Sequence, residues 1–447
     1  MRTDDDNRPA GPLRQPLRLL VIASDTYPPR RVDVSVLFGE ELAGRGHGID
    51  WVLQSEAPCG RAYVTSWGGG TVYVGAMDHG DSLARRVRKH LLGILNDLKV
   101  FRLLRRGRYD AVIVKDKFVS GVAALLAARL ARTRFVYWLS YPFPEHYLYL
   151  ARSGDARYPL LYRVRGTAFK VMLYRWLLPA ADHVLVQSEQ MRRDVAAEGV
   201  PPDKMTAVPM GIKATELLPL PANLRRILIP EDERCLLYLG TLGKVRRLDF
   251  LVRVLALVRR RVPEAKLYLV GRGDDPSDEQ ALVEEAARHG VLAAMRFVGE
   301  LPREEALRYV READVCVSPI YATPVLRPGS PTKLVEYLAL GKAVVANDHP
   351  EQRLVIEQSG AGYCVPWDEQ AFADAVVELL EAPPELRRAM GERGRRYVAE
   401  HRTYDKLADL VEQTLVRVVT PPDQDASATP FAEPGGLVDD RRPRSPR

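Results

Sequence analysis

A short polar loop near residue 330 leads directly into a helix that carries one carboxylate. The loop spans Ser330–Lys333, the helix ends at Gly341, and an apolar strand follows at once. A helix N-terminus offers free backbone N–H groups and the positive end of a dipole, and both suit a phosphate group. Glu336 stands one turn further on, where its carboxylate can accept hydrogen bonds from sugar hydroxyls. This spacing predicts a cradle for a nucleotide-sugar.

A second candidate for ligand binding is the tripeptide Gly271-Arg272-Gly273, which follows an apolar run. Glycines after a strand let the backbone approach a base or a phosphate closely. The alternative is that Gly271 and Gly273 only form a turn, because a Gly-x-Gly pattern alone is weak. No Gly-x-Gly-x-x-Gly follows the first strand, which argues against a dehydrogenase.

Short apolar runs alternate with helical segments along the chain, and these elements must position the candidate residues. Such alternation predicts parallel sheets wound on both faces. In the first half the expected strands are 17–24, 49–54, 111–115, 134–139 and 183–187, with a helix at 35–45. In the second half they are 235–240, 265–271, 295–299, 315–319 and 343–347, separated by helices at 249–261, 278–289 and 304–312. The pattern indicates two Rossmann-like α/β domains in tandem.

The domain boundaries follow from changes in composition. Residues 16–213 form the first domain, the proline-rich stretch 214–230 a linker, and residues 231–402 the second domain. The segment 384–419 is helical, and we expect breaks near Gly391 and Gly394 and a new start at Thr403. Residues 1–15 and 420–447 are polar or rich in proline, and we expect both ends to be disordered.

Composition and charge narrow the class of protein. A chain of 447 residues with 46% hydrophobic and 28% charged residues is typical of a soluble, two-domain protein. No apolar run approaches the roughly 18–20 residues of a membrane span, and no secretory signal begins the chain, so we expect a cytoplasmic location. No cysteine spacing fits a zinc site.

Positive charge gathers in the first half of the chain, within a net charge of +7. Arginine and lysine are frequent in 85–108, and in 152–175 they alternate with tyrosine, phenylalanine and tryptophan. Such a mixture fits an anionic membrane surface, and hence a peripheral position at the inner membrane face, or nucleic acid. A solvated, arginine-rich helix face is the alternative. No nucleic-acid motif supports that partner.

Several motifs in a fixed order resemble one family, the retaining family-four glycosyltransferases (glycosyl transferases group 1) of the GT-B fold. The resemblance covers residues 17–419. The matching segments are 27–29 (Tyr-Pro-Pro), 42–47, 186–189, 203–211, 238–242, 269–273, 297–299, 313–315 and 330–346. It implies that the second domain binds a nucleotide-sugar, the first binds the acceptor across a cleft, and the last helix, 403–419, returns to the first domain. It also implies retention of anomeric configuration without a metal or other cofactor.

The resemblance also assigns roles to donor-side residues. Glu336 matches the second glutamate of a paired signature that binds the nucleotide ribose. Arg246 stands at the position of a lysine that neutralises the diphosphate, while Thr241 replaces the neighbouring arginine, so Lys244 is expected to supply the second charge. The donor loop contributes Ser330, Thr332 and Lys333, for which helix capping is the simpler interpretation.

Three departures from the family pattern concern the sugar and the acceptor. The first signature glutamate is replaced by Pro328, which leaves recognition of the donor sugar open. The usual paired glycines of the N-terminal loop are replaced by Arg30, Arg31, Val32 and Asp33, whose arginines can bring charge to the same place. The histidine common near Trp138 is absent, and Glu145 and His146 are the nearest acceptor-side candidates.

The leading hypothesis is therefore a glycosyltransferase that uses a UDP- or GDP-sugar and a glycan or lipid-linked acceptor in cell-surface polysaccharide or glycolipid synthesis. A nucleotide-sugar epimerase of the same fold is one alternative, although no clear set of acid and base residues is present. A catalytically silent binding protein is another, suggested by Pro328 and Thr241. The sequence does not predict the sugar, the linkage or the oligomeric state.

Overall fold

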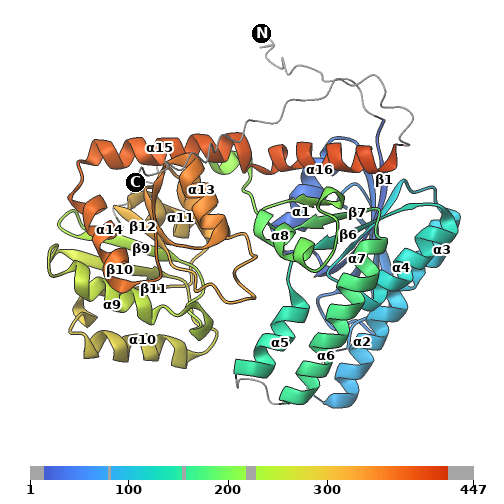
Figure 1. Ribbon diagram of the computed structural model, residues 1–447, viewed down its shortest axis with the longest axis horizontal. Coiled ribbons are helices and arrows are strands. Elements are labelled where there is room, and N and C mark those ends of the chain that lie inside the picture. The colour runs from blue at the N-terminus through green and yellow to red at the C-terminus, as the bar shows by residue number, and fades with distance from the viewer. Residues whose placement is uncertain (1–14, 79–81, 154–157, 218–227, 421–447) are drawn as a thin grey trace, which may run out of the picture.

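The computed structural model describes residues 15–78, 82–153, 158–217 and 228–420. The expected disordered ends and most of the expected linker lie outside these ranges. Within them the chain forms two α/β domains side by side, and two C-terminal helices run along one edge of both (Figure 1).

The first domain is built on an eight-stranded sheet. Its strands are β1 (Arg18–Tyr27), β2 (Gly48–Ser55), β3 (Tyr63–Trp67), β4 (Gly70–Gly75), β5 (Ala111–Lys115), β6 (Arg134–Leu139), β7 (His183–Val186) and β8 (Met205–Ala207). Their order across the sheet is β3-β4-β2-β1-β5-β6-β7-β8. All neighbours pair in parallel except β3 and β4, an antiparallel edge hairpin that the prediction of a parallel sheet did not include. This edge aside, the expected strands are confirmed.

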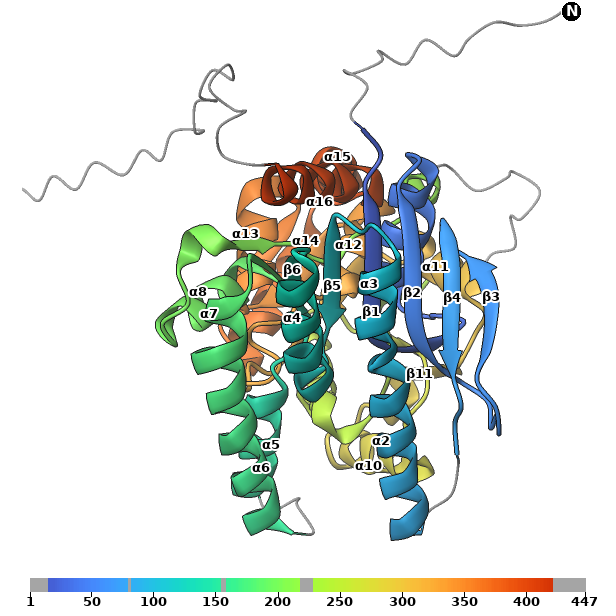
Figure 2. The ribbon, with the colours of Figure 1, turned by 90° about the vertical axis from the view of Figure 1, so that its right-hand side faces the viewer.

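Helices cover both faces of this sheet (Figure 2). They are α1 (Val32–Ser35), the π-helical η1 (Leu37–Leu42), α2 (Leu83–Asp97), α3 (Lys99–Arg106), α4 (Phe118–Ala131), α5 (Phe143–Ser153), α6 (Pro159–Val171), the π-helical η2 (Met172–Leu177), α7 (Leu178–Ala180), α8 (Glu189–Ala197), and two short 3-10 segments, η3 (Pro202–Lys204) and η4 (Ala214–Leu217). Side chains of α3, α4, η2 and α8, such as Leu104, Ala124 and Leu177, form the core on one face. Side chains of α1 and η1, such as Val34 and Phe38, form the core on the other.

The second domain has a six-stranded sheet whose strand pairs are all parallel. Its strands are β9 (Arg234–Leu239), β10 (Ala265–Val270), β11 (Met295–Gly299), β12 (Val315–Ser318), β13 (Val344–Asn347) and β14 (Gly362–Val365), in the order β11-β10-β9-β12-β13-β14. Its helices are the short η6 (Lys244–Arg246) and η7 (Leu292–Ala294), α9 (Asp249–Val258), α10 (Pro276–Arg288), α11 (Arg303–Glu312), α12 (Thr332–Ala339), α13 (Pro350–Ser359), α14 (Glu369–Glu381) and α15 (Pro384–His401). The carboxyl ends of these parallel strands form one edge, where ligands bind in open α/β sheets.

The chain crosses between the domains at two places that lie side by side. The Ile212 N–H donates to the Arg402 carbonyl at 3.0 Å, and the Tyr404 N–H donates to the Ile212 carbonyl at 2.9 Å. After this crossing α16 (Tyr404–Val419) packs on η1 of the first domain, where Arg45 bonds to Glu412 at 2.8 Å. The returning helix and the GT-B architecture are therefore confirmed.

Helix α15 differs from its prediction because it is continuous through Gly391 and Gly394. A β-carbon on Gly391 would lie 1.8 Å from the carbonyl oxygen of Gly341, and one on Gly394 would lie 2.8 Å from the β-carbon of Ala361. Both glycines let α15 approach α12 and β14 closely. Their role is close packing, and the expected breaks were wrong.

We expect Gly391→Ala to destabilise the second domain. Because the added methyl group must displace backbone atoms, the free energy of unfolding should fall by about 1–3 kcal/mol despite the better helix propensity of alanine. Thermal denaturation measures the change. Gly44→Ala is the matched control, since that helical glycine has open space around it and should be neutral or slightly stabilised. Equal melting temperatures for all three proteins would contradict the packing role.

Candidate functional site

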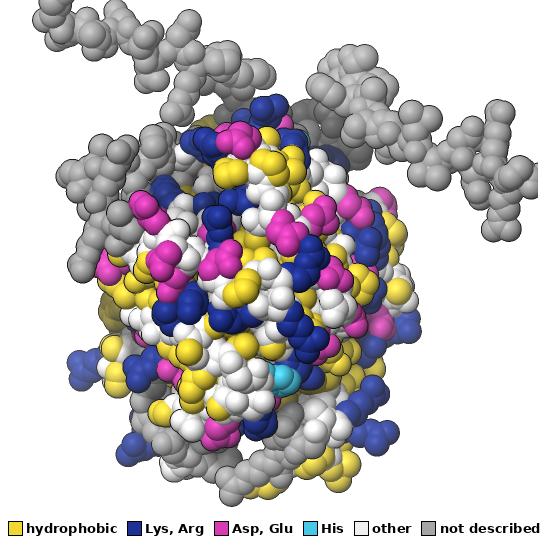
Figure 3. Space-filling view, turned by 90° about the vertical axis from the view of Figure 1, so that its left-hand side faces the viewer, with side chains coloured by type: hydrophobic (Ala, Val, Ile, Leu, Met, Phe, Trp, Pro, Cys, Tyr) yellow, Lys and Arg dark blue, Asp and Glu magenta, His cyan; other side chains and the backbone are white. Residues whose placement is uncertain are grey.

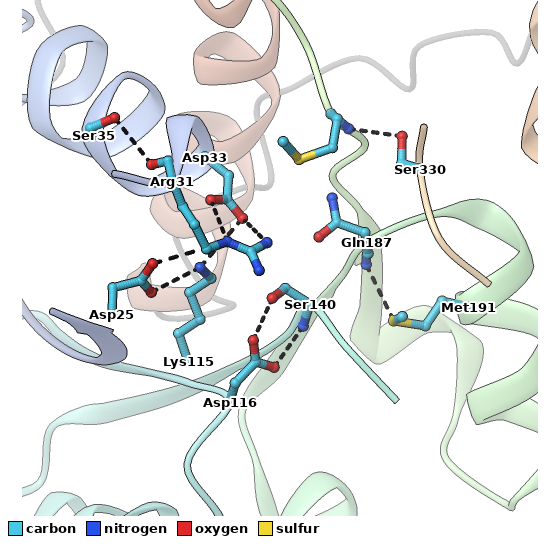
Figure 4. Close-up of polar contacts among 11 residues, drawn as sticks. Asp25, Arg31, Asp33, Ser35, Lys115, Asp116, Ser140, Gln187, Met191 and Ser330 are labelled. Carbon is cyan, nitrogen blue, oxygen red and sulfur yellow. Dashed lines mark hydrogen bonds and ion pairs between the residues drawn. The ribbon is translucent and has the colours of Figure 1, made fainter. Parts of the chain in front are cut away.

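The loop between β12 and α12, residues 319–331, connects the second domain to the first through hydrogen bonds. The Ser188 hydroxyl donates to the Pro328 carbonyl at 2.7 Å. The Met210 N–H donates to the hydroxyl of Ser330, which Figure 4 labels, at 2.9 Å. Ser330, expected in the donor loop, therefore bonds to the backbone of the first domain. Pro328, at the position where the resemblance implies a glutamate, takes part in the contact with Ser188 through its carbonyl.

Two glycines stand at the carboxyl ends of adjacent strands in the second domain. Gly240 directly follows β9 and Gly271 directly follows β10, with φ values of +138° and +142° that favour glycine. A β-carbon on Gly271 would lie 2.0 Å from the Gly240 carbonyl oxygen, and one on Gly240 would lie 2.2 Å from Cε of Lys333. The tight approach lets the side chain of Lys333 cross the end of β9.

Lys333 belongs to a compact cluster with Tyr238, Thr241 and Arg246. Its Nζ donates to the Tyr238 hydroxyl at 2.6 Å and lies 4.4 Å from the centre of that ring. The Tyr238 hydroxyl donates to the Thr241 carbonyl at 3.1 Å, and Arg246 Nε donates to the Thr241 hydroxyl at 3.3 Å. The structure thus brings together three predicted donor-side residues that lie up to 92 positions apart, Thr241, Arg246 and Lys333.

The ammonium group of Lys333 is strongly perturbed. Burial, and to a smaller extent the charge of Arg246, lower the pKa of Lys333 to about 7, while Glu336 opposes the change. No carboxylate is recorded within salt-bridge distance of it among the described residues. A bound anion beside Lys333 would favour the protonated form, so the site is suited to a diphosphate.

Lys244 was expected to supply the second positive charge beside Arg246, but the structure places its side chain differently. Its side chain is exposed, and its backbone N–H donates to Asp278 Oδ1 at 3.3 Å at the start of α10. The second positive charge in the cluster with Arg246 is that of Lys333. Sequence spacing favoured Lys244 because it is local to Arg246, whereas Lys333 arrives from another helix.

Glu336 is mostly buried, with 12% of its side chain exposed, and it has a cationic partner. Arg303 Nη1 lies 2.8 Å from Glu336 Oε1, and Arg303 Nη2 lies 2.8 Å from Glu216 Oε2. The ion pair aligns the carboxylate one helical turn from Lys333. Arg303 begins α11 and was missed from the sequence, because nothing local marks it as a partner of Glu336.

The remaining donor-side predictions lie around these residues. Arg272 is exposed and lines a hollow of about 590 Å³ with Glu279, Gly299, Glu300, Leu301 and Pro302. Thr332 is the first residue of α12, and the preceding Pro331 offers no side-chain cap to the helix N-terminus.

On the first domain, Arg31 and Asp33 belong to a charged cluster beyond the ends of β1 and β5 (Figure 4). Arg31 makes a bidentate contact with Asp33, with Nη2 at 2.8 Å from Oδ2 and Nε at 3.1 Å from Oδ1. The fully buried Lys115 lies 3.0 Å from Asp25 and 3.4 Å from Asp33. Burial alone would raise the pKa of Asp33, but Lys115 and Arg31 hold it below its usual value. Arg30 instead points to Glu56, at 2.5 Å, and is highly exposed.

The sequence prediction did not include Asp25, Lys115, Asp116 or Ser140. Asp116 has a positive φ of 55°, and its carboxylate accepts the Ser140 N–H at 2.8 Å and also the Ser140 hydroxyl. Burial raises the pKa of Asp116. The sequence did contain a signal for Lys115 and Asp116, because these two charged residues stand at the carboxyl end of an otherwise apolar strand. Functional side chains of parallel sheets gather at such strand ends.

Glu145 and His146 lie together at the start of α5. The Tyr174 hydroxyl donates to Glu145 at 3.1 Å, and the Tyr141 hydroxyl lies 3.0 Å from His146 Nδ1. Burial raises the pKa of Glu145 and lowers that of His146. Glu145 lines a cavity of about 300 Å³ whose other wall includes Pro324, Arg327 and Pro328 of the loop 319–331.

The two halves of the site face each other across the domain boundary. Burial raises the pKa of Tyr141 in the first domain, and the charge of Arg246 in the second domain opposes that rise. Among the residues that the structure describes, no group of three or more histidine, cysteine, aspartate or glutamate side chains could hold a metal ion.

Family comparisons match both domains. The family described as "Glycosyl transferases group 1" matches residues 221–397, and that described as "Glycosyl transferase 4-like domain" matches residues 36–211. The two matched ranges cover most of the second and first domains respectively.

Curated relatives carry related descriptions. A D-inositol 3-phosphate glycosyltransferase of Thermobispora bispora is 25% identical over 334 residues, which cover 72% of this chain and 74% of that protein. A phosphatidyl-myo-inositol mannosyltransferase of Mycolicibacterium smegmatis is 35% identical over 156 residues, which cover 34% of this chain and 37% of that protein.

Solved structures share the fold at low identity. A sucrose-phosphate synthase from Thermosynechococcus elongatus superposes with a TM-score of 0.67 and 19% identity, over 90% of this chain and 99% of that chain. HepE of Anabaena, solved in complex with UDP, gives a TM-score of 0.63 at 13% identity, over 90% of this chain and 100% of the other.

Proposed function

The chain belongs to the group 1 glycosyltransferases of the GT-B fold, and we propose that it transfers a sugar, with retention of anomeric configuration, from a UDP- or GDP-sugar to a glycan or lipid-linked acceptor. One observation carries the donor assignment. Lys333 and Arg246 are linked through Tyr238 and Thr241 at the carboxyl end of β9, and Glu336 stands one helical turn from Lys333. A nucleoside diphosphate needs these two kinds of group, cations for its phosphates and a carboxylate for its ribose.

In this proposal each donor-side residue has one role. Arg246 and Lys333 neutralise the diphosphate, with Thr241 holding Arg246. Glu336, aligned by Arg303, accepts the ribose hydroxyls. The hollow at Arg272 receives the base, and the N–H groups of α12 at Thr332 face the phosphates.

The proposed reaction retains the configuration of the anomeric carbon. The bond from the anomeric carbon to the phosphate oxygen breaks, and the acceptor hydroxyl oxygen bonds to that carbon from the same face. The hydroxyl proton passes to the departing phosphate oxygen, so no separate base is needed. Arg246 and Lys333 stabilise the charge that develops on the leaving diphosphate, and no metal ion is required.

The acceptor lies on the first domain in this proposal. Arg31, fixed by Asp33, and the cavity beside Glu145 and His146 offer charged and polar groups to it. The relative described as a phosphatidyl-myo-inositol mannosyltransferase supports a lipid-linked acceptor, used in polysaccharide or glycolipid synthesis at the inner membrane face. The complexes of HepE with UDP and UDP-glucose support a UDP-sugar donor.

The test is to incubate the purified protein with a panel of UDP- and GDP-sugars and to measure nucleotide release with and without membrane extract. Release that depends on the extract is expected. Binding without release would favour a silent binding protein, and isomerisation of the nucleotide-sugar would favour an epimerase.

We expect Glu336→Ala to weaken UDP or GDP binding by roughly 10- to 100-fold, because two hydrogen bonds from ribose to a charged group are lost. Titration calorimetry measures the dissociation constant. Glu284→Ala is the matched control, since Glu284 is exposed on α10 and bonds only to Gln280 among the contacts described for it. Unchanged nucleotide affinity in Glu336→Ala would remove the ribose assignment.

A further inference from the structure

Three helices of the first domain expose large apolar side chains on their outer side. Helix α4 lies between α3 and η2, with α2 also in contact, so that these helices form one layer over the sheet (Figure 2). Their inner sides form the core, but their outer sides carry leucine, valine and tryptophan in contact with solvent. We call these the outer apolar residues: Leu91, Leu95, Val119, Val122, Leu126, Leu130, Leu160, Leu161, Val164, Val171 and Trp176.

The exposure is large and follows the helix period. Leu160 is 75% exposed, Leu130 is 73% exposed and Trp176 is 68% exposed. In α4 the exposed residues recur at intervals of three and four, which places them on one stripe. Large apolar side chains exposed in this number on neighbouring helices are typical of an interaction surface.

The helical segments 83–96, 118–131 and 159–180 of this layer carry basic and no acidic side chains. Arg88 and Arg129 pair with Asp78 and Asp182, which lie just outside these segments. Exposed basic side chains stand among the outer apolar residues: Arg88, Lys89, Arg129, Arg132, Arg163, Arg165 and Arg175. By contrast, the outer face of the second domain intersperses acidic and basic side chains (Figure 3).

We propose that the outer faces of α2, α4 and α6 dock on an anionic lipid bilayer. Apolar side chains bury in the boundary between head groups and acyl chains, while arginine and lysine meet the lipid phosphates. Nucleic acid would satisfy the arginines but would leave the exposed leucines and valines in water. No helix in the described part of the chain is long and apolar enough to cross a membrane, so docking here is on the surface.

Docking is connected to the proposed function because one helix carries outer apolar residues and also lines the cavity beside Glu145. The continuous helix formed by α6 and η2 exposes Leu160 and Val164 outward, and its Lys170 and Tyr174 line the cavity beside Glu145. A lipid-linked acceptor held in the bilayer would therefore reach the cavity along the helix that touches the membrane. This geometry rests on the proposed acceptor site, whereas docking itself does not.

The experiment is co-sedimentation of the full chain with vesicles of phosphatidylcholine alone or with about one-third phosphatidylglycerol. We expect binding to the anionic vesicles only, weakened by salt. The double variant Leu160→Glu/Leu161→Glu should bind at least about tenfold more weakly, and Arg163→Ser about fivefold. The matched control is Leu292→Glu/Leu386→Glu, which changes two exposed leucines of the second domain and should bind normally.

Failure of the unaltered chain to bind anionic vesicles would overturn the proposal, and so would equal binding by the variant Leu160→Glu/Leu161→Glu. A third such outcome is a dimer of the unaltered chain in light scattering that becomes a monomer in this variant. The surface would then bind a second copy of the chain. Affinity for UDP, measured on the same variants, should stay unchanged. Loss of vesicle binding with normal UDP binding therefore tests docking, and absence of nucleotide release in the unaltered chain tests the proposed transferase.

Discussion

Replacement of Lys333 by methionine is expected to lower kcat/KM for the nucleotide-sugar by roughly 100- to 1,000-fold, the usual cost of removing one group that stabilises a leaving-group charge. Methionine keeps the unbranched stem that crosses Gly240 and removes the ammonium group. Because that ammonium is buried, the melting temperature of Lys333→Met should equal or exceed that of the unaltered chain.

The control for this experiment is Lys244→Met, which removes an exposed charge from the short segment that also holds Arg246. We expect its kcat/KM to change by less than about threefold, as for a screened surface charge. The sequence favoured Lys244 as the second cation, so a large effect at Lys244 and a small one at Lys333 would reverse the assignment made from the structure.

The pH dependence of donor binding gives an independent signature of Lys333. Its pKa in the free protein is about 7, and the diphosphate favours the protonated form. Affinity for UDP-glucose should therefore be highest below pH 7 and fall as the pH rises above it, because binding then requires uptake of a proton. Calorimetric titration between pH 6 and about 8.5 measures this trend. In Lys333→Met the trend should disappear.

Replacement of Lys115 by methionine is expected to destabilise the first domain by about 3–5 kcal/mol, the typical cost of leaving buried charges without their partner. Lys115 is fully buried between Asp25 and Asp33, and both carboxylates would lose its compensation. Chemical denaturation monitored by tryptophan fluorescence measures the loss, since Trp138 lies beside the Lys115 ammonium. Lys406→Met, at an exposed lysine of α16, is the control and should change stability by less than about 0.5 kcal/mol.

The pH dependence of this effect has a defined sign. The pKa of Asp33 is held below its usual value, so its ion pairs stabilise the fold at neutral pH and are lost as the pH falls through that lowered pKa. The difference between Lys115→Met and the unaltered chain should therefore shrink in acid. A second substitution, Asp25→Asn, should recover part of the stability by removing one unpaired charge. A constant difference at all pH values, or no recovery, would show that packing alone explains the loss.

Most secondary structure was predictable because its signals are local. Buried parallel strands such as β6 and β11 appear as short apolar runs between helical segments, and their predicted bounds agree with the structure. The β3–β4 hairpin was missed because β3 is largely exposed and β4 is a short strand bounded by glycines. Gly391 was predicted to break the helix. Only a glycine fits there because the carbonyl of Gly341 lies against it, and that residue is 50 positions away in the chain.

The sequence alone determined the two α/β domains and the helix at 403–419, because hydrophobic periodicity is written into neighbouring residues. The return of that helix to the first domain was implied by the family resemblance, and the donor-side roles of 240–246 and 330–336 stay predictions. Only the tertiary structure decided which charges meet. It placed Lys333 beside Tyr238 in the cluster with Arg246, joined Glu336 to Arg303, and buried Lys115 between two aspartates. The physical reason is that such contacts join side chains from separate elements, and their distances depend on how sheets and helices pack, which no spacing along the chain records.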